Sequence, residues 1–183
     1  MTLYRTILID PPWQQGMVGK FAKAQNKRPE KLPYKTMSVE EIAAMRIPQI
    51  ADEECHLWLW TTNSTLRSGF DLLDRWGFRH LAPIHWVKPS GAGAWFVHRT
   101  QTILFGYRGK LRMGKKLRPN VLFESARRHS QKPASSYELF EAVSFSPRLE
   151  LFARETRPGW DVWGDQVKSS AEFDSDFILG KTA

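Results

Sequence analysis

The sequence predicts an α/β fold, in which a mostly parallel β-sheet carries helices on both of its faces. Short apolar runs rich in β-branched residues alternate along the chain with segments whose apolar residues recur at helical spacing. The 183 residues fit one domain that is long enough to bury a substantial core. Hydrophobic residues make up 42% of the chain, as in ordinary globular proteins.

The first strand is predicted at residues 6–10, because TILID is short, apolar and β-branched and stops at two prolines that cannot donate ladder hydrogen bonds. Residues 14–35 are polar and rich in lysine, glycine and proline, which predicts a mobile loop too long to be a simple connector. Ser38 and Glu41 have the spacing of a capping box, so a helix is expected to begin there.

The later elements are predicted by the same patterns. A helix is expected where apolar residues recur between Leu66 and Leu73, and another after Pro133, which suits a first helical turn. The polar end of the chain is expected to fray, so we divide the sequence into a domain of residues 1–168 and a polar C-terminal tail of residues 169–183. Further strands are expected at residues 56–60, 84–88, 101–107, 121–124, 149–154 and 161–163.

The composition limits the possible partners. Lysine and arginine number 27 against 19 acidic residues, and the net charge of +8 favours a polyanion through phosphate contacts and counterion release. Cys55 is the single cysteine, which excludes an intramolecular disulfide and a cysteine-based metal site, and no metal is expected. No apolar run approaches the roughly 18 residues of a membrane-spanning helix. We therefore expect a soluble, cytoplasmic protein without membrane partners.

The most informative motif is Asp10-Pro11-Pro12-Trp13, which follows the first predicted strand. Ligands of α/β sheets bind at the carboxyl ends of the strands. The Asp10 carboxylate and the Pro11 carbonyl are two hydrogen-bond acceptors that the prolines hold rigidly. Such acceptors suit an aromatic amine that becomes tetrahedral as it reacts, and Trp13 offers a flat face for stacking on a base. The alternative is a plain strand end and turn, with Trp13 in the core.

Other segments accompany this motif in a specific order. They are ILIDPPW, LPYKTMSVEEI at 32–42, HLWLWTTN at 56–63, WGF at 76–78, IHWVK at 84–88, HSQKP at 129–133, LELFAR at 149–154, Gly159-Trp160 and Gly164-Asp165-Gln166. In this order, from Thr6 to about Val167, they resemble the adenine-N6 methyltransferase family. That family contains the catalytic subunit of the eukaryotic messenger-RNA methyltransferase and many bacterial and phage relatives.

The resemblance implies a Rossmann-like methyltransferase fold with a permuted motif order, in which the catalytic motif precedes much of the cofactor site. It implies methyl transfer from S-adenosylmethionine to the N6 amine of adenine in a nucleic acid. Tyr34 would flank the target base, unless it packs only locally. The catalytic residues would be Asp10, Pro11, Pro12 and Trp13, and the cofactor would be bound by Asp10, Pro12, Lys132, Arg154, Asp165 and Gln166.

The sequence departs from the family pattern in three places. Asp165 stands where relatives have asparagine, and a carboxylate accepts hydrogen bonds from ribose hydroxyls but cannot donate one. Only five residues precede Thr6, whereas relatives have an upstream segment that contributes to the adenine pocket of the cofactor. That contribution is expected to be missing or replaced. The segment after Arg154 is short, so no role is assigned to residues 155–158.

A basic segment is the second candidate for substrate contact. Nine lysines and arginines and one acid lie between Arg108 and Lys132, and we expect a phosphate-tracking surface beside the site, with a solvated face as the alternative. Phosphate contacts of this kind position a nucleic acid without reading its sequence. The expected nucleic-acid-binding residues are Lys88, Arg108, Lys110, Arg112, Lys115, Lys116, Arg118, Arg127 and Arg128.

The tryptophans divide into two groups. Trp58, Trp60, Trp76 and Trp86 lie in predicted strands or at a helix end and are expected in the core. Trp95 lies in the glycine-containing run GAGAWF and is a candidate for stacking on nucleic acid.

These observations predict a DNA-directed enzyme of bacterial or phage type. DNA is preferred because the chain is compact and carries no added RNA-binding module, and RNA is the alternative with the same chemistry. The rivals are a non-catalytic relative that acts as a scaffold subunit and a basic binding module whose motif is accidental. A homodimer is a further expectation, because a small enzyme of this kind can use a second subunit to hold its substrate.

Overall fold

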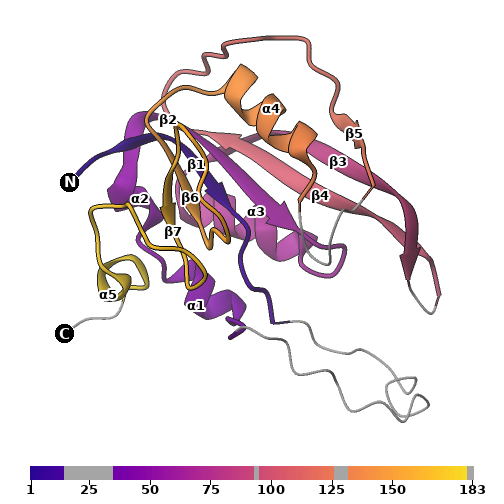
Figure 1. Cartoon of the computed structure of the whole chain (residues 1–183), viewed down its shortest axis with the longest axis horizontal. Helices are drawn as coiled ribbons and strands as arrows, with labels where there is room; N and C mark the ends of the chain where they lie inside the picture. Colours follow the sequence, from indigo (N-terminus) through magenta and orange to yellow (C-terminus); the bar gives the residue numbers. More distant parts are fainter. Residues whose placement is uncertain (15–34, 93–94, 126–131, 181–183) are drawn as a thin grey trace.

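The computed structural model describes residues 1–14, 35–92, 95–125 and 132–180. The described residues form one seven-stranded sheet with the strand order β5-β3-β4-β2-β1-β6-β7 (Figure 1). Apart from its two ends, the predicted loop of residues 14–35 lies outside them. The strands are β1 (Tyr4–Ile9), β2 (Ala51–Thr61), β3 (Arg79–Ala92), β4 (His98–Tyr107), β5 (Val121–Phe123), β6 (Arg148–Leu151) and β7 (Asp161–Trp163).

Strand direction defines two edges of the sheet. Within the described residues β4 runs antiparallel to β2 and β3, and the other four pairings are parallel. The carboxyl ends of all strands except β4 therefore lie at one edge, the carboxyl edge, where β4 begins. The opposite edge, the amino edge, holds the starts of those strands and the end of β4. The prediction of a mostly parallel sheet is confirmed.

The chain enters this sheet near its middle. β1 pairs with β2 on one side and with β6 on the other, where Thr6 lies opposite Arg148. In the doubly wound order 3-2-1-4-5-6, β7 and β6 take the places of strands 2 and 1, while β1 and β2 take those of strands 4 and 5. The first strands of that order come last in this chain, which confirms the permuted order. The winding reverses between β6 and β1, and ligands bind at such a switch point.

Helices cover both faces of the sheet, as predicted (Figure 1). Ile7 and Ile9 of β1 belong to an apolar cluster with α1 (Val39–Ala43), α2 (Ile47–Ile50), α3 (Leu66–Arg75) and α5 (Ser175–Ile178). Leu8 points to the other face and joins a second cluster with α4 (Ala134–Val143). Because β1 is buried on both faces, its sequence is a continuous apolar run rather than an alternating one. Four expected core tryptophans are buried: Trp58, Trp60, Trp76 and Trp86.

Helix α1 begins at the predicted capping box. Ser38 Oγ accepts a hydrogen bond from Glu41 N at 3.1 Å, and Glu41 Oε2 accepts one from Ser38 N at 2.7 Å. These two bonds satisfy backbone donors that a helix start otherwise leaves unpaired. The N-cap Ser38 directly follows Met37, which forms a β-bridge with Trp13. The start of the helix is therefore fixed relative to Trp13.

The C-terminal segment differs from the expectation of a frayed tail. It contains α5, whose Ile178 is fully buried in the cluster with α1, α2 and α3. Ala171, Phe173, Phe177 and Leu179 pack partly buried against the same cluster. The segment is polar on average, but the large apolar side chains of its described part pack against the domain, which the average composition did not indicate.

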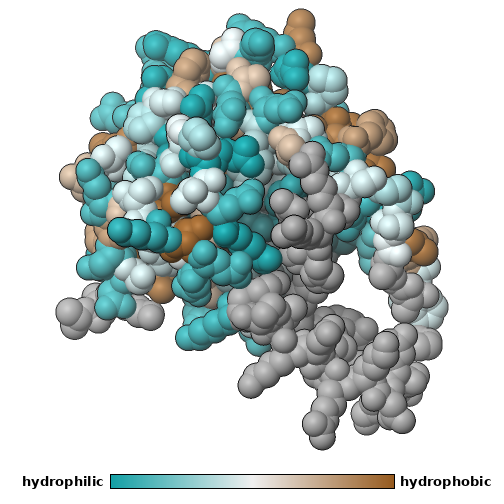
Figure 2. All heavy atoms as spheres, viewed as in Figure 1, coloured by the Kyte–Doolittle hydropathy of each residue, from teal (hydrophilic) through white to brown (hydrophobic). Residues whose placement is uncertain are grey.

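The surface of the molecule is more hydrophilic than the two buried clusters (Figure 2). The face seen in Figure 2 is mostly hydrophilic, with small separate apolar areas. Trp95 is 85% exposed on the segment that joins β3 to β4. None of the helices in the described part of the chain has the length and apolar character needed to cross a bilayer.

Candidate active site

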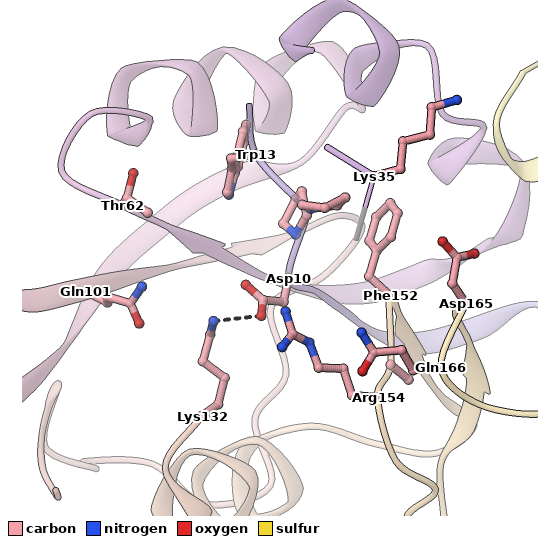
Figure 3. A pocket seen from close by; sticks show the side chains of 13 residues that line it. Asp10, Trp13, Lys35, Thr62, Gln101, Lys132, Phe152, Arg154, Asp165 and Gln166 are labelled. Carbon is pink, nitrogen blue, oxygen red and sulfur yellow. Dashed lines mark hydrogen bonds and ion pairs between the residues drawn. The ribbon is translucent and has the colours of Figure 1, made fainter. Parts of the chain in front are cut away.

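A cavity of about 110 Å³ lies at the switch point, beside the carboxyl ends of the paired strands β1 and β6 (Figure 3). It is reached by the segments that follow β1, β2, β6 and β7, by the first part of β4, and by Lys132, two residues before α4. All of them meet at the carboxyl edge. The cavity is lined by Asp10, Pro11, Pro12, Trp13, Lys35, Thr62, Gln101, Lys132, Phe152, Ala153, Arg154, Asp165 and Gln166.

An ion pair joins two sides of this cavity. Lys132 Nζ donates to Asp10 Oδ2 at 2.6 Å, and the two side chains are only 13% and 25% exposed (Figure 3). The Lys132 ammonium also lies 4.9 Å from the centre of the Trp60 ring, where a cation is attracted to the aromatic face. Reduced contact with water strengthens the attraction between the two charges. The cavity thus presents one fixed anion and one fixed cation in direct contact.

The Asp10–Trp13 loop is anchored by backbone bonds. Trp13 N donates to the Pro11 carbonyl at 2.8 Å, and Met37 N donates to the Pro12 carbonyl at 2.8 Å. Trp13 is only 6% exposed, and its indole Nε1 donates to the Trp60 carbonyl at 3.0 Å. The indole therefore fixes the loop to β2, while its predicted stacking on a base stays a prediction. The Pro11 carbonyl keeps a second lone pair for another donor.

The opposite wall is built by the turns after β6 and β7. The strand predicted at 149–154 ends at Leu151, because Phe152 takes a left-handed backbone conformation with φ of 61°. Ala153 N donates to the Trp163 carbonyl at 3.0 Å. A side chain at Gly164 would collide with the Ala153 carbonyl oxygen, so only glycine allows the two turns to approach this closely. Phe152 is one of two described non-glycine residues with positive φ, and such strain is common at functional sites.

A second cavity of about 270 Å³ adjoins the first and shares Pro12, Lys35, Phe152 and Asp165 with it. Its remaining lining is more apolar and comes from Met37, Glu41, Ala44, Trp163 and Leu179. Together the cavities form a recess with a charged half at Asp10 and Lys132 and an apolar half at the ring of Phe152.

A buried acid lies under this recess. Burial raises the pKa of the Glu150 carboxyl from 4.5 to about 7, while a hydrogen bond from Tyr137 opposes the shift and the charge of Asp10 adds to it. Tyr137 OH donates to Glu150 Oε1 at 2.8 Å. Burial also raises the pKa of the Tyr137 hydroxyl, so the tyrosine remains a donor at neutral pH. The Arg157 guanidinium lies 3.7 Å from the centre of the Tyr137 ring.

Comparison with known proteins assigns this architecture to a family. Residues 4–166 match the MT-A70 family. The chain belongs to the MT-A70 family. The match begins at β1 and ends at Gln166, so it includes the Asp10–Trp13 loop and the turns after β6 and β7.

Individual relatives of this MT-A70 chain differ greatly in length. It is 29% identical over 176 residues to the putative N(6)-adenosine-methyltransferase MT-A70-like protein of Medicago truncatula, covering 90% of this chain and 26% of that protein. It is 27% identical to the N(6)-adenosine-methyltransferase catalytic subunit METTL3 of Homo sapiens, and the match covers 96% of this chain and 30% of METTL3. It is 28% identical to the Type II methyltransferase M.MunI of Mycoplasma sp, and that match covers 90% of this chain and 78% of M.MunI. The chain thus spans about a quarter of the plant relative's length.

The fold brings together every described cofactor and catalytic residue that the sequence predicts for this MT-A70 domain. The residues that meet in the first cavity are Asp10, Pro11, Pro12, Trp13, Lys132, Arg154, Asp165 and Gln166. Lys88 lies in the last part of β3 at the carboxyl edge, with its ammonium 5.5 Å from the centre of the Trp86 ring. Tyr34, Arg127 and Arg128 lie outside the described residues.

The expected position of the basic segment is wrong for its first part. Arg108 follows the end of β4 at the amino edge, and its backbone N donates to the Cys55 carbonyl near the start of β2 at 2.9 Å. Lys115 N donates to Ala142 at the end of α4. In Figure 1 the segment between β4 and β5 crosses the top, away from the end of β1. The segment starts at the amino edge because β4 runs antiparallel to its neighbours. The residues whose expected position beside the site is therefore wrong are Arg108, Lys110, Arg112, Lys115, Lys116 and Arg118.

Sequence reasoning missed five residues that line the first cavity: Lys35, Thr62, Gln101, Phe152 and Ala153. Thr62 directly follows β2 at the carboxyl edge, so the rule that located Asp10 could also have found it. Gln101 could not be found in this way, because it lies near the start of a strand that only the structure identifies as antiparallel.

Proposed function

We propose that this MT-A70 domain transfers a methyl group from S-adenosylmethionine to the N6 amine of adenine in a nucleic acid. The observation that carries the proposal is the ion pair at the switch point between Lys132 and Asp10, the first residue of the Asp10–Trp13 loop. The family match supports the reaction class, because several relatives are named as N(6)-adenosine-methyltransferases. The fold alone would not support it, since Rossmann-like sheets host many reactions.

The residues of the recess fit this cofactor. Its amino acid end carries a carboxylate and an ammonium group, and the charged half of the recess offers Lys132 and Arg154 to the first and Asp10 to the second. Asp165 and Gln166 supply acceptors for ribose hydroxyls. Among the described residues no cluster of acids, histidines and cysteine could hold a metal ion. When bound, the cofactor supplies an electrophilic methyl group on a positively charged sulfur.

The chain's own contribution is to position and polarise the amine. The adenine N6 lone pair is delocalised into the ring, so the nitrogen is a weak nucleophile until it becomes tetrahedral. We assign the free oxygen of Asp10 and the Pro11 carbonyl as acceptors for its two N–H groups, which favours that geometry. Methylation would leave the nitrogen with one proton too many, and the Asp10 carboxylate would pass that proton to water. Lys132 holds the Asp10 carboxylate in position through its hydrogen bond.

We propose DNA as the substrate polymer. The supporting comparison is the Type II methyltransferase M.MunI, which this chain matches over 78% of that protein's length. The target adenine must leave the base stack, either by flipping from a duplex or because the strand is single. Cytoplasmic location, a bacterial or phage origin and a homodimer belong to this proposal.

The test is transfer of labelled methyl from S-adenosylmethionine to matched duplex DNA, single-stranded DNA and RNA, with product identified as N6-methyladenine. Asp10→Asn keeps the shape but removes the charge, and transfer should fall on the order of 100-fold or more. Asp71→Asn on the exposed face of α3 is the matched control and should retain wild-type transfer. RNA as the preferred polymer would move the proposal to RNA. Absence of product with a folded, cofactor-binding protein would identify a non-catalytic scaffold instead.

A further inference from the structure

Helix α5 and the residues that follow it are held against the MT-A70 domain by specific contacts. The Ile178 side chain is fully buried, and its carbonyl accepts a hydrogen bond from Arg46 N at 3.0 Å. Asp174 caps the helix by accepting from Phe177 N at 2.6 Å. At Gly180 the backbone has φ of 67°, and any side chain there would collide with the Ala44 carbonyl oxygen. These contacts fix the position of the residue between Ile178 and Gly180.

That residue, Leu179, is part of the wall of the second cavity. The cavity has a volume of about 270 Å³, and Phe152 and Trp163 contribute aromatic rings that meet edge to face with centres 5.4 Å apart. Apart from Lys35, which both cavities share, the polar groups of the lining are the carboxylates of Glu41 and Asp165. A mostly apolar space bordered by aromatic rings and a few acceptors suits a planar heterocycle that carries N–H groups.

We propose that α5 and Leu179 complete the adenine-binding half of the cofactor site. The inference rests on the proposed use of S-adenosylmethionine. The first cavity contains the charges of Lys132 and Arg154 and suits the amino acid end of the cofactor, and the second adjoins it and suits the purine. Leu179 and Phe152, which both line this cavity, would contact the purine. The C-terminal segment therefore belongs to the binding domain and is a specificity-determining part of it.

The proposal has a direct binding test. Leu179→Asp places a charge in the apolar cavity, and the Kd for S-adenosylhomocysteine, measured by isothermal titration calorimetry, should rise about tenfold or more. Leu81→Asp is the matched control, because Leu81 is 45% exposed at the amino end of β3, and it should bind like the wild type. Equal Kd values for wild type and Leu179→Asp would overturn the inference. A wild type that binds no S-adenosylhomocysteine would overturn the proposed cofactor itself.

A second measurement uses the unaltered protein, in case Leu179→Asp does not fold. Backbone amides of Ile178, Leu179 and Gly180 donate within the α5 turn. Saturating S-adenosylhomocysteine should slow their hydrogen exchange about tenfold or more, because α5 must open for them to exchange. Slowed exchange at residue 153 without any change at residues 178–180 would show that the cofactor binds and that α5 takes no part.

Discussion

At the scale of the residue, Asp10 and Lys132 define what the site can do. A single charge in the recess would lose hydration without a partner, whereas here the Lys132 ammonium and the Asp10 carboxylate are in direct contact at 2.6 Å. The pair leaves one oxygen of Asp10 for a further donor, and the Pro11 carbonyl has a free lone pair beside it. The two acceptors are thus ready before any ligand arrives, which is the arrangement that polarises a weak nucleophile without reorganisation.

Glu150 gives a prediction about pH. Its pKa is raised by burial to about 7 from 4.5, so the folded chain binds a proton more tightly than the unfolded chain. The resulting stabilisation is complete below pH 4.5 and is lost as pH rises through 7. Urea unfolding should show Glu150→Gln losing this dependence, a change on the order of 3 kcal/mol between the two limits. Glu138→Gln, exposed on α4, is the control, and an identical pH dependence in Glu150→Gln would refute the prediction.

The predictability of the site also differs residue by residue. Asp10 could be located because two prolines stop an apolar run, and Lys132, Arg154, Asp165 and Gln166 because of their family motifs. The burial of Trp13 was only an alternative to stacking on a base, and the sequence could not decide between them because its indole bonds to a carbonyl 47 residues away. The conformation of Phe152 could not be predicted either, since its left-handed backbone is required by the packing of two turns rather than by its own sequence.

At the scale of the element, strand direction decides which side chains reach the substrate. β4 has ten residues, so its two ends are roughly 30 Å apart. Its start contributes Gln101 to the cavity, and its end carries Arg108 to the amino edge. β4 is buried on both faces and has a continuous apolar run like the parallel strand β1, so the sequence predicted the strand while its direction remained open. The misplaced basic segment follows from that ambiguity.

This geometry predicts different roles for two groups of lysines. Lys88→Glu at the carboxyl edge should weaken binding of a short labelled oligonucleotide and reduce the slope of log Kd against log salt by about one. Lys115→Glu with Lys116→Glu at the amino edge should leave that slope unchanged. Fluorescence anisotropy across a salt series measures both. A slope that falls by about two in the double variant would mean that the amino edge contacts phosphates.

At the scale of the whole molecule, the sheet has one reversal of winding, and the charged recess lies at it. The α/β class, the helices on both faces and the buried tryptophans could be predicted, because they depend on local periodicity. The docking of α5 could not, since a four-residue helix with one buried isoleucine has almost no periodic signal. Its stability comes from contacts with α1 and α2 rather than from its own propensity.

Ligand binding should stabilise the entire domain through this recess. S-adenosylhomocysteine at 100 times its Kd should raise the free energy of unfolding by about 2.7 kcal/mol, as measured by urea titration with tryptophan fluorescence. At that same ligand concentration Lys132→Met should gain much less, because the cofactor carboxylate loses its partner. Lys116→Met at the amino edge should gain as much as the wild type. Equal stabilisation of all three proteins would exclude Lys132 from the binding site.

The position of β1 has a consequence for how the protein is made. Translation produces the catalytic strand and its loop early, but β6, which borders the strand on one side, is completed only at residue 151. At typical synthesis rates the interval is on the order of ten seconds. During that time the emerging chain has a bare apolar strand edge in the middle of its future sheet, so chaperones have a defined segment to shield. The recess forms only once the turns after β6 and β7 have been made, because they build one of its walls.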